Sequence, residues 1–151
     1  MSGDGDGPKR SRGRVAAVDL GTRRIGIAYS DSGRTLASPW GTIERSGDPD
    51  GDRRAIVAAV QECEAKTVVI GLPLSLSGQA GPAARSALEE AEALRDLLGP
   101  TGVTVETADE RFTTVEAERS LRAAGRSGKA ARKVVDSAAA MVLLQAWLDN
   151  A

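Results

Sequence analysis

The chain contains no histidine and a single cysteine, Cys63, among its 151 residues. The missing histidine excludes His-based catalytic triads and His-ligated zinc sites. One cysteine cannot form an internal disulfide, so nothing in the sequence points to an oxidising compartment. Because Cys63 continues the apolar stripe of a predicted helix, we expect a small buried side chain there rather than a reactive thiol.

Aromatic residues, long hydrophobic runs and net charge are also scarce. The aromatic residues are too few to form a platform for stacked bases: Tyr29, Trp40, Phe112 and Trp147. No apolar run approaches the ~20 residues that span a bilayer, and the N-terminus has no hydrophobic signal region. The 20 basic and 21 acidic residues nearly cancel, so only local charge clusters could indicate a nucleic-acid partner. We expect a soluble, cytoplasmic protein without membrane contact.

The length suits one domain with a sizeable core. Residues 1–14 lack large apolar side chains after Met1, which predicts a disordered tail before a single domain over 15–150. Apolar runs predict strands over 15–20, 25–29, 34–44, 67–73 and 103–109, and Pro39 and Gly41 place the third at a sheet edge. Helices are predicted over 48–63, 82–98, 113–125 and 134–149. This order predicts an α/β fold with one mixed five-stranded sheet flanked by helices.

Acidic residues stand where several of these elements end or begin. Asp19 ends a strand that is otherwise apolar, and Asp109 and Glu110 end another. Because the carboxyl ends of parallel strands meet at one edge of a sheet, we expect these side chains to lie close together. The simpler alternative for Asp19 is a turn-capping role beside Gly21.

The last predicted helix would add a third carboxylate. Asp136 shares an apolar stripe with Ala139, Ala140, Leu143 and Trp147, which predicts that this stripe packs on the sheet. The two alanines would allow close approach and bring Asp136 near the end of a central strand. For Asp136 alone, an interaction with the helix dipole is the alternative.

Three converging carboxylates can remain ionised together only if cations pair them. Oxygen-only ligands suit Mg²⁺ or Mn²⁺. Two such ions ~3.5–4 Å apart form the active site of many enzymes that cleave phosphodiester bonds. The sequence therefore predicts a two-ion Mg²⁺ or Mn²⁺ site.

Four segments resemble the signature blocks of the YqgF/RuvX family: DLGTRRIGIA at 19–28, GLPL at 71–74, DERFTT at 109–114 and VDSAA at 135–139. The similarity covers residues 14–150 in order. It implies an RNase H-like fold related to the RuvC resolvases, and a nuclease that processes the 5′ end of the 16S ribosomal RNA precursor.

The resemblance also bears on the metal ligands. RuvC-like enzymes carry a glutamate near the end of the fourth strand, where this chain has GLP at 71–73, so Asp109 or Glu110 would have to supply it. We assign metal binding and catalysis to Asp19, Glu110 and Asp136. Asp109 remains a further catalytic candidate, with a turn role as its alternative.

A basic segment lies between the two acidic blocks. Residues 119–133 include six basic residues and no acidic one, with a glycine-containing link at 125–128. A basic loop beside a metal site would contact phosphates, whereas an ordinary solvated face is the alternative. The candidate nucleic-acid-binding residues are Arg23, Arg24, Arg111, Arg122, Arg126, Lys129, Arg132 and Lys133.

Three functions follow from these features. The first is a metal-dependent nuclease acting on precursor ribosomal RNA or the small ribosomal subunit. The second is a Holliday junction resolvase, which uses the same chemistry on four-way DNA, and the third is a non-catalytic RNA-binding module. Residues 19–22 also resemble the first phosphate motif of actin-like ATPases, but those folds need two domains facing a nucleotide. No long exposed apolar stripe predicts an interface, so we expect a monomer or a weak homodimer.

Overall fold

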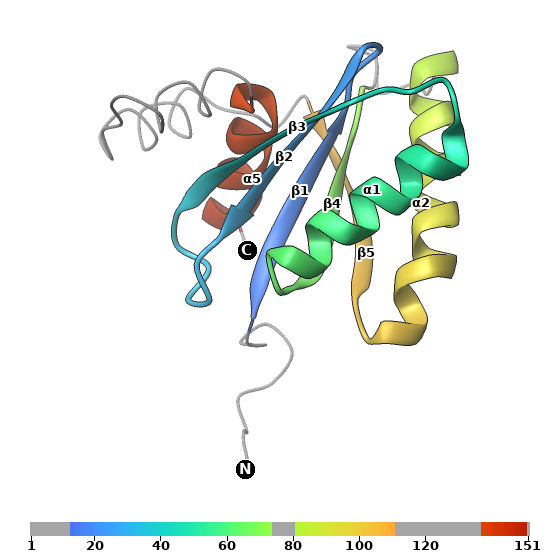
Figure 1. Ribbon diagram of the computed structural model, residues 1–151. Helices are drawn as coiled ribbons and strands as arrows, with labels where there is room; N and C mark the ends of the chain where they lie inside the picture. The colour runs from blue at the N-terminus through green and yellow to red at the C-terminus, as the bar shows by residue number, and fades with distance from the viewer. Residues whose placement is uncertain (1–12, 74–80, 111–136, 151) are drawn as a thin grey trace.

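The computed structural model describes residues 13–73, 81–110 and 137–150. Within them, five strands form one mixed sheet in the order β3-β2-β1-β4-β5 (Figure 1). The strands are β1 Arg14–Leu20, β2 Arg24–Ser30, β3 Ala37–Glu44, β4 Ala65–Leu72 and β5 Thr104–Asp109. Strands β1, β2 and β3 form an antiparallel meander, whereas β1, β4 and β5 are parallel. The carboxyl ends of β1, β4 and β5 therefore meet at one edge of the sheet.

Helices cover both faces of this sheet (Figure 1). Helix α1 (Pro49–Glu62) leads to β4, and α2 (Pro82–Leu98) leads through a short 3₁₀ turn, η2 (Gly99–Thr101), to β5. Both begin with proline at the first turn, where its missing N–H costs no hydrogen bond. Helix α5 (Ala138–Asp149) lies on the opposite face and packs against β1, β2 and β3. None of the described helices is long and apolar enough to cross a membrane.

The central strand β1 divides the core into two clusters. Ala16 and Val18 belong to the cluster under α1 and α2, whereas Val15 and Ala17 belong to the cluster under α5. All four side chains are fully buried. Since side chains alternate along a strand, Asp19 continues the set that faces α5.

The mixed five-stranded sheet predicted from the sequence is confirmed, and the described helices lie where expected. Strand β3 lies at a sheet edge, as Pro39 and Gly41 predict. Its register against β2 shifts by one residue, because Ile27 pairs with Gly41 and Ala28 with Pro39. Cys63 is buried, and burial raises the pKa of its thiol to about 11. Residues 1–12 of the tail predicted over 1–14 and the helix predicted over 113–125 lie outside the described residues.

Two details of the prediction were wrong. Arg14 does not belong to the tail, because it begins β1, pairs with Ala65 and donates a hydrogen bond to the carbonyl of Cys63. Ala139 does not face the sheet, because it is exposed. The buried side of α5 is instead formed mainly by Ala140, Met141, Leu143, Leu144 and Leu148, with Trp147 partly buried beside them.

The turn after β1 holds the backbone tightly at Gly21. Its N–H donates to the carbonyl of Asp19 at 3.1 Å, and its own carbonyl accepts a bond from Arg45 Nε at 2.7 Å. A Cβ atom on Gly21 would lie 2.5 Å from the backbone oxygen of Arg24. A side chain here would therefore have to displace the backbone of β2.

We expect Gly21→Ala to lower the free energy of unfolding by about 1–3 kcal/mol, as overpacking of a tight site does. Urea unfolding measures the change. Gly99→Ala is the matched control, because Gly99 has a helical φ of −51° and a Cβ atom there would meet no other atom within 4 Å. Equal stability of the two variants would contradict a steric requirement at Gly21.

Candidate active site

Asp19 lies near the carboxyl end of β1, on the face covered by α5. Its register partner on β2 is Gly26. On the other side, Val18 pairs with Ile70 of β4, so the next residue of β4 is Gly71. The strands that flank Asp19 thus place glycines beside it, and Asp19 is half-buried.

Glu110 directly follows β5 and reaches back across the sheet toward Asp19. Its carboxyl group lies over Gly71 of β4, the strand between β5 and β1. The two carboxyl groups hydrogen bond to each other. Two acidic residues that are 91 positions apart in the sequence therefore meet at the carboxyl edge of the sheet.

The electrostatics of this pair favour protonation. Burial raises the pKa of Asp19, and the hydrogen bond with Glu110 opposes that rise. Burial also raises the pKa of Glu110, and the negative charge of Asp19, the hydrogen bond to it and the charge of Asp109 raise it further. Because two like charges in contact repel strongly, the arrangement favours a proton shared between the two carboxyl groups when no cation is bound.

Asp109 lies on the other face of β5. Val105 packs in the cluster under α1 and α2, whereas Ala108 packs in the cluster under α5. Alternation places Asp109 with Val105, away from Asp19. Of the two adjacent acids at this strand end, the structure brings Glu110 to Asp19, and the charge of Asp109 raises the pKa of Glu110.

Most of the other predicted site residues lie outside the described part of the chain. They are Asp136, Arg111, Arg122, Arg126, Lys129, Arg132 and Lys133. Arg23 and Arg24 are described and exposed, one in the β1–β2 turn and one at the start of β2. Arg24 pairs with Glu44 of β3 at 3.0 Å. Among the described residues, no group of three acidic or cysteine side chains is placed to hold a metal ion.

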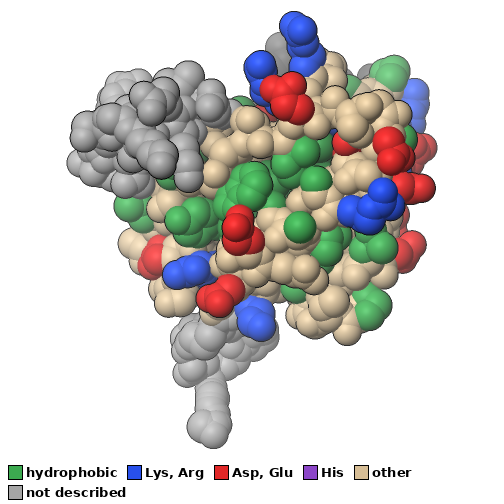
Figure 2. Space-filling model, viewed as in Figure 1, with side chains coloured by type: hydrophobic (Ala, Val, Ile, Leu, Met, Phe, Trp, Pro, Cys, Tyr) green, Lys and Arg blue, Asp and Glu red, His purple; other side chains and the backbone are tan. Residues whose placement is uncertain are grey.

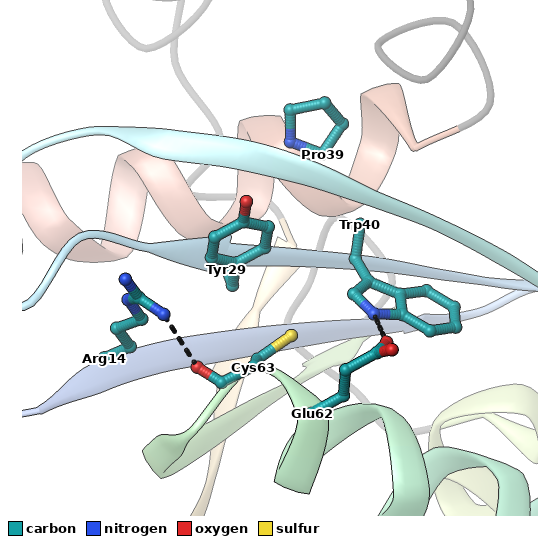
Figure 3. Close-up of a pocket in the computed structure, with 6 residues that line it drawn as sticks. All are labelled: Arg14, Tyr29, Pro39, Trp40, Glu62 and Cys63. Atoms are coloured by element: carbon teal, nitrogen blue, oxygen red, sulfur yellow. Dashed lines mark hydrogen bonds between the residues drawn. The ribbon is translucent and has the colours of Figure 1, made fainter. Parts of the chain in front are cut away.

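The aromatic residues Tyr29 and Trp40 lie together in a hollow that sequence reasoning missed. Figure 2 shows the face seen in Figure 1, where basic and acidic side chains are interspersed and hydrophobic ones gather near the middle. A cavity of about 400 Å³ is lined by Arg14, Tyr29, Pro39, Trp40, Glu62 and Cys63 (Figure 3). It lies on the α1 side of the sheet, whereas the carboxyl pair lies on the α5 side.

Two contacts join residues that line this hollow. Trp40 Nε1 donates to Glu62 at 2.6 Å, and the Arg14 guanidinium lies 5.8 Å from the centre of the Tyr29 ring (Figure 3). The first contact ties α1 to β3, and the second ties β1 to β2. The hollow is therefore explained by packing and is separate from the candidate active site.

Comparison with known proteins adds a family and close relatives. The family model RuvX, described as "Holliday junction resolvase", matches residues 13–150. A protein of Mycobacterium sp. (strain KMS) named "Putative pre-16S rRNA nuclease" is 45% identical over 148 residues, covering 98% of this chain and 85% of the relative. A protein of the same name from Mycobacterium tuberculosis (strain ATCC 25177 / H37Ra) is 46% identical over 140 residues, covering 92% and 80%.

Solved structures of resolvases share the fold. Thermus thermophilus RuvC superposes with a TM-score of 0.55 over 88% of this chain and 92% of its own, at 12% identity. The yeast mitochondrial Holliday junction resolvase Ydc2 gives a TM-score of 0.51 over 91% and 80%, at 10% identity. At these identities the similarity establishes the RNase H-like architecture of the sheet and its helices.

The raised pKa values predict how stability varies with pH when no divalent cation is present. A carboxyl group with a raised folded-state pKa contributes stability below the unfolded pKa, and that contribution is lost as the pH rises through the folded pKa. Glu110→Gln keeps a donor toward Asp19 and removes one charge. Above about pH 4.3, the ordinary pKa of a glutamate, we expect wild type to lose stability relative to this variant as the pH rises.

Urea unfolding across this pH range in a chelator measures the difference. Asp96→Asn removes a carboxylate from an exposed position on α2 and serves as the control. A constant difference between wild type and Glu110→Gln would show that the pair is not coupled.

Proposed function

Because the chain belongs to the RuvX family, we propose that it is a metal-dependent nuclease that cleaves phosphodiester bonds at the 5′ end of the 16S ribosomal RNA precursor. The observation that carries this proposal is the pairing of Asp19 and Glu110 at the carboxyl edge of the parallel strands. A purely structural RNA-binding module has no need for two half-buried acids in contact, since the charge of Asp19 makes ionisation of Glu110 less favourable.

The donor set of the pair fits Mg²⁺ or Mn²⁺. Both groups are carboxylates, which hard divalent cations prefer, and both have raised pKa values that a bound cation would lower. A divalent cation would supply Lewis acidity toward a phosphate and a nucleophilic hydroxide from bound water. Asp19 and Glu110 would hold it, with Asp136 as the third carboxylate and two ions as the full complement.

In this proposal, the acidic residues would hold the cation and the basic residues would bind the phosphate backbone of the substrate. Asp19 is fixed by the ladder of β1, and Glu110 is held over β4, so the two carboxylates are oriented before substrate arrives. Arg23, Arg24 and Arg111, together with Arg122, Arg126, Lys129, Arg132 and Lys133, would bind the phosphate backbone. Such contacts position a strand without reading its bases.

We favour RNA over a DNA junction as substrate. The named relatives at 45–46% identity carry a pre-16S ribosomal RNA nuclease name, whereas the RuvC structures share only 12% identity. A monomer or weak homodimer in the cytoplasm, acting on precursor ribosomal RNA or the small subunit, fits one metal site per chain. Junction resolution remains the second candidate, because the family model itself is described as a resolvase.

A cleavage assay in Mg²⁺ or Mn²⁺ tests the proposal on single-stranded precursor RNA, duplex RNA and four-way DNA in parallel. We expect the single-stranded RNA to be cut best. Loss of an outer group around a metal costs about 10–100-fold, so Asp19→Asn and Glu110→Gln, which change ligands, should reduce cleavage by more than that.

Asp96→Asn is the matched control, because it removes an exposed carboxylate on α2 and should leave cleavage unchanged. Undiminished cleavage by Asp19→Asn would remove the carboxyl pair from the mechanism. Paired nicks in four-way DNA with intact single-stranded RNA would replace the RNA nuclease by the resolvase.

A further inference from the structure

The contact between Asp19 and Glu110 has to cross an intervening strand. Neighbouring strands lie roughly 4.8 Å apart, so β1 and β5 are separated by roughly twice that distance across β4. On the α5 face, the position of β4 between the two acids is Gly71. Glu110 can therefore reach Asp19 only if β4 presents no side chain at that point.

The space above Gly71 is filled by its neighbours. A Cβ atom on Gly71 would lie 2.5 Å from Oε2 of Glu110 and 3.0 Å from its Cγ. It would also lie 3.0 Å from Cδ2 of Leu143 on α5. The smallest possible side chain would thus meet the carboxyl group of Glu110 itself, at a distance that Cβ atoms do not tolerate.

The backbone of Gly71 gives no other reason for glycine. The residue pairs in register with Ala108 of β5, and its φ lies outside the positive range that favours glycine. Glycine inside a strand weakens that strand, because it adds conformational entropy to the unfolded chain and packs no side chain. A glycine that the backbone does not need, within a buried strand, marks a close approach by another group.

We propose that Gly71 is a positioning residue, whose missing side chain opens the path by which the Glu110 carboxylate joins Asp19 in one divalent-cation site. The cation in this inference rests on the proposed function, whereas the positioning role of Gly71 rests on the contacts described above. Gly71 touches no substrate and acts only through Glu110. Because Oε2 ends a flexible side chain, Gly71→Ala should fold with the Glu110 carboxyl group displaced.

The first measurement is the crystal structure of Gly71→Ala without metal. We expect the carboxyl group of Glu110 to leave Gly71 and lose its hydrogen bond to Asp19, while the strands keep their register. A carboxyl pair that is unchanged in this variant overturns the proposal. This readout does not depend on metal binding, so it is decisive even if the proposed function fails.

The second measurement is the dissociation constant of Mn²⁺, from the electron paramagnetic resonance signal of free Mn²⁺. We expect Gly71→Ala to weaken binding by about tenfold or more, as loss of a group that orients a metal ligand does. Gly99→Ala is the control and should bind as wild type does. Wild-type affinity in Gly71→Ala overturns the proposal, whereas no Mn²⁺ binding by wild type contradicts the proposed function alone.

A double variant separates positioning from packing against α5. Leu143→Val removes the δ-methyl groups that the new Cβ would approach, so Gly71→Ala/Leu143→Val relieves the clash with α5 and keeps the clash with Glu110. We expect this variant to retain the tenfold loss of Mn²⁺ affinity. Recovery of wild-type affinity would show that Gly71 serves helix packing instead.

Discussion

The burial of two carboxyl groups against each other is the constraint around which this fold is arranged. Asp19 and Glu110 are held where burial raises the pKa of each, and the charge of one further raises the pKa of the other. Such a pair is stable only when a proton or a cation lies between its oxygens. Ionisation of the pair therefore opposes folding when no metal is bound, which is typical of a functional site.

The arrangement of strands and helices brings the carboxyl groups of Asp19 and Glu110 together. Parallel strands β1, β4 and β5 bring their carboxyl ends to one edge, and the register of β4 sets a glycine between the two acids. Helix α5 covers the same face and contributes Leu143 beside that glycine. The opposite face carries α1, α2 and the hollow lined by Tyr29 and Trp40, so this hollow and the candidate active site lie on different sides of one sheet.

The sequence predicts the elements and the edge at which the acids gather, because apolar runs, turn residues and prolines act locally. The sequence does not establish which of the adjacent acids, Asp109 or Glu110, lies beside Asp19. Strand β1 is apolar on both faces, so its pattern does not show which face carries Asp19. In β5, only Val105 and Ala108 are apolar, so the sequence does not show which face of the strand is directed at the helix α5. Ala139 was placed wrongly for a similar reason, because an alanine-rich helix has little contrast between its sides. The sequence does show Gly71 inside a buried strand. The side chain that approaches it belongs to Glu110, 39 positions later in the sequence, and only the folded structure shows this contact.

Anomalous diffraction from crystals soaked in Mn²⁺ would show whether Asp19 and Glu110 form one divalent-cation site, because it locates manganese independently of any assay. We expect manganese bound to oxygens of both carboxylates over Gly71, with the hydrogen bond between them gone. Manganese elsewhere, with the two carboxyl groups still hydrogen bonded, would show that the pair is not a cation site.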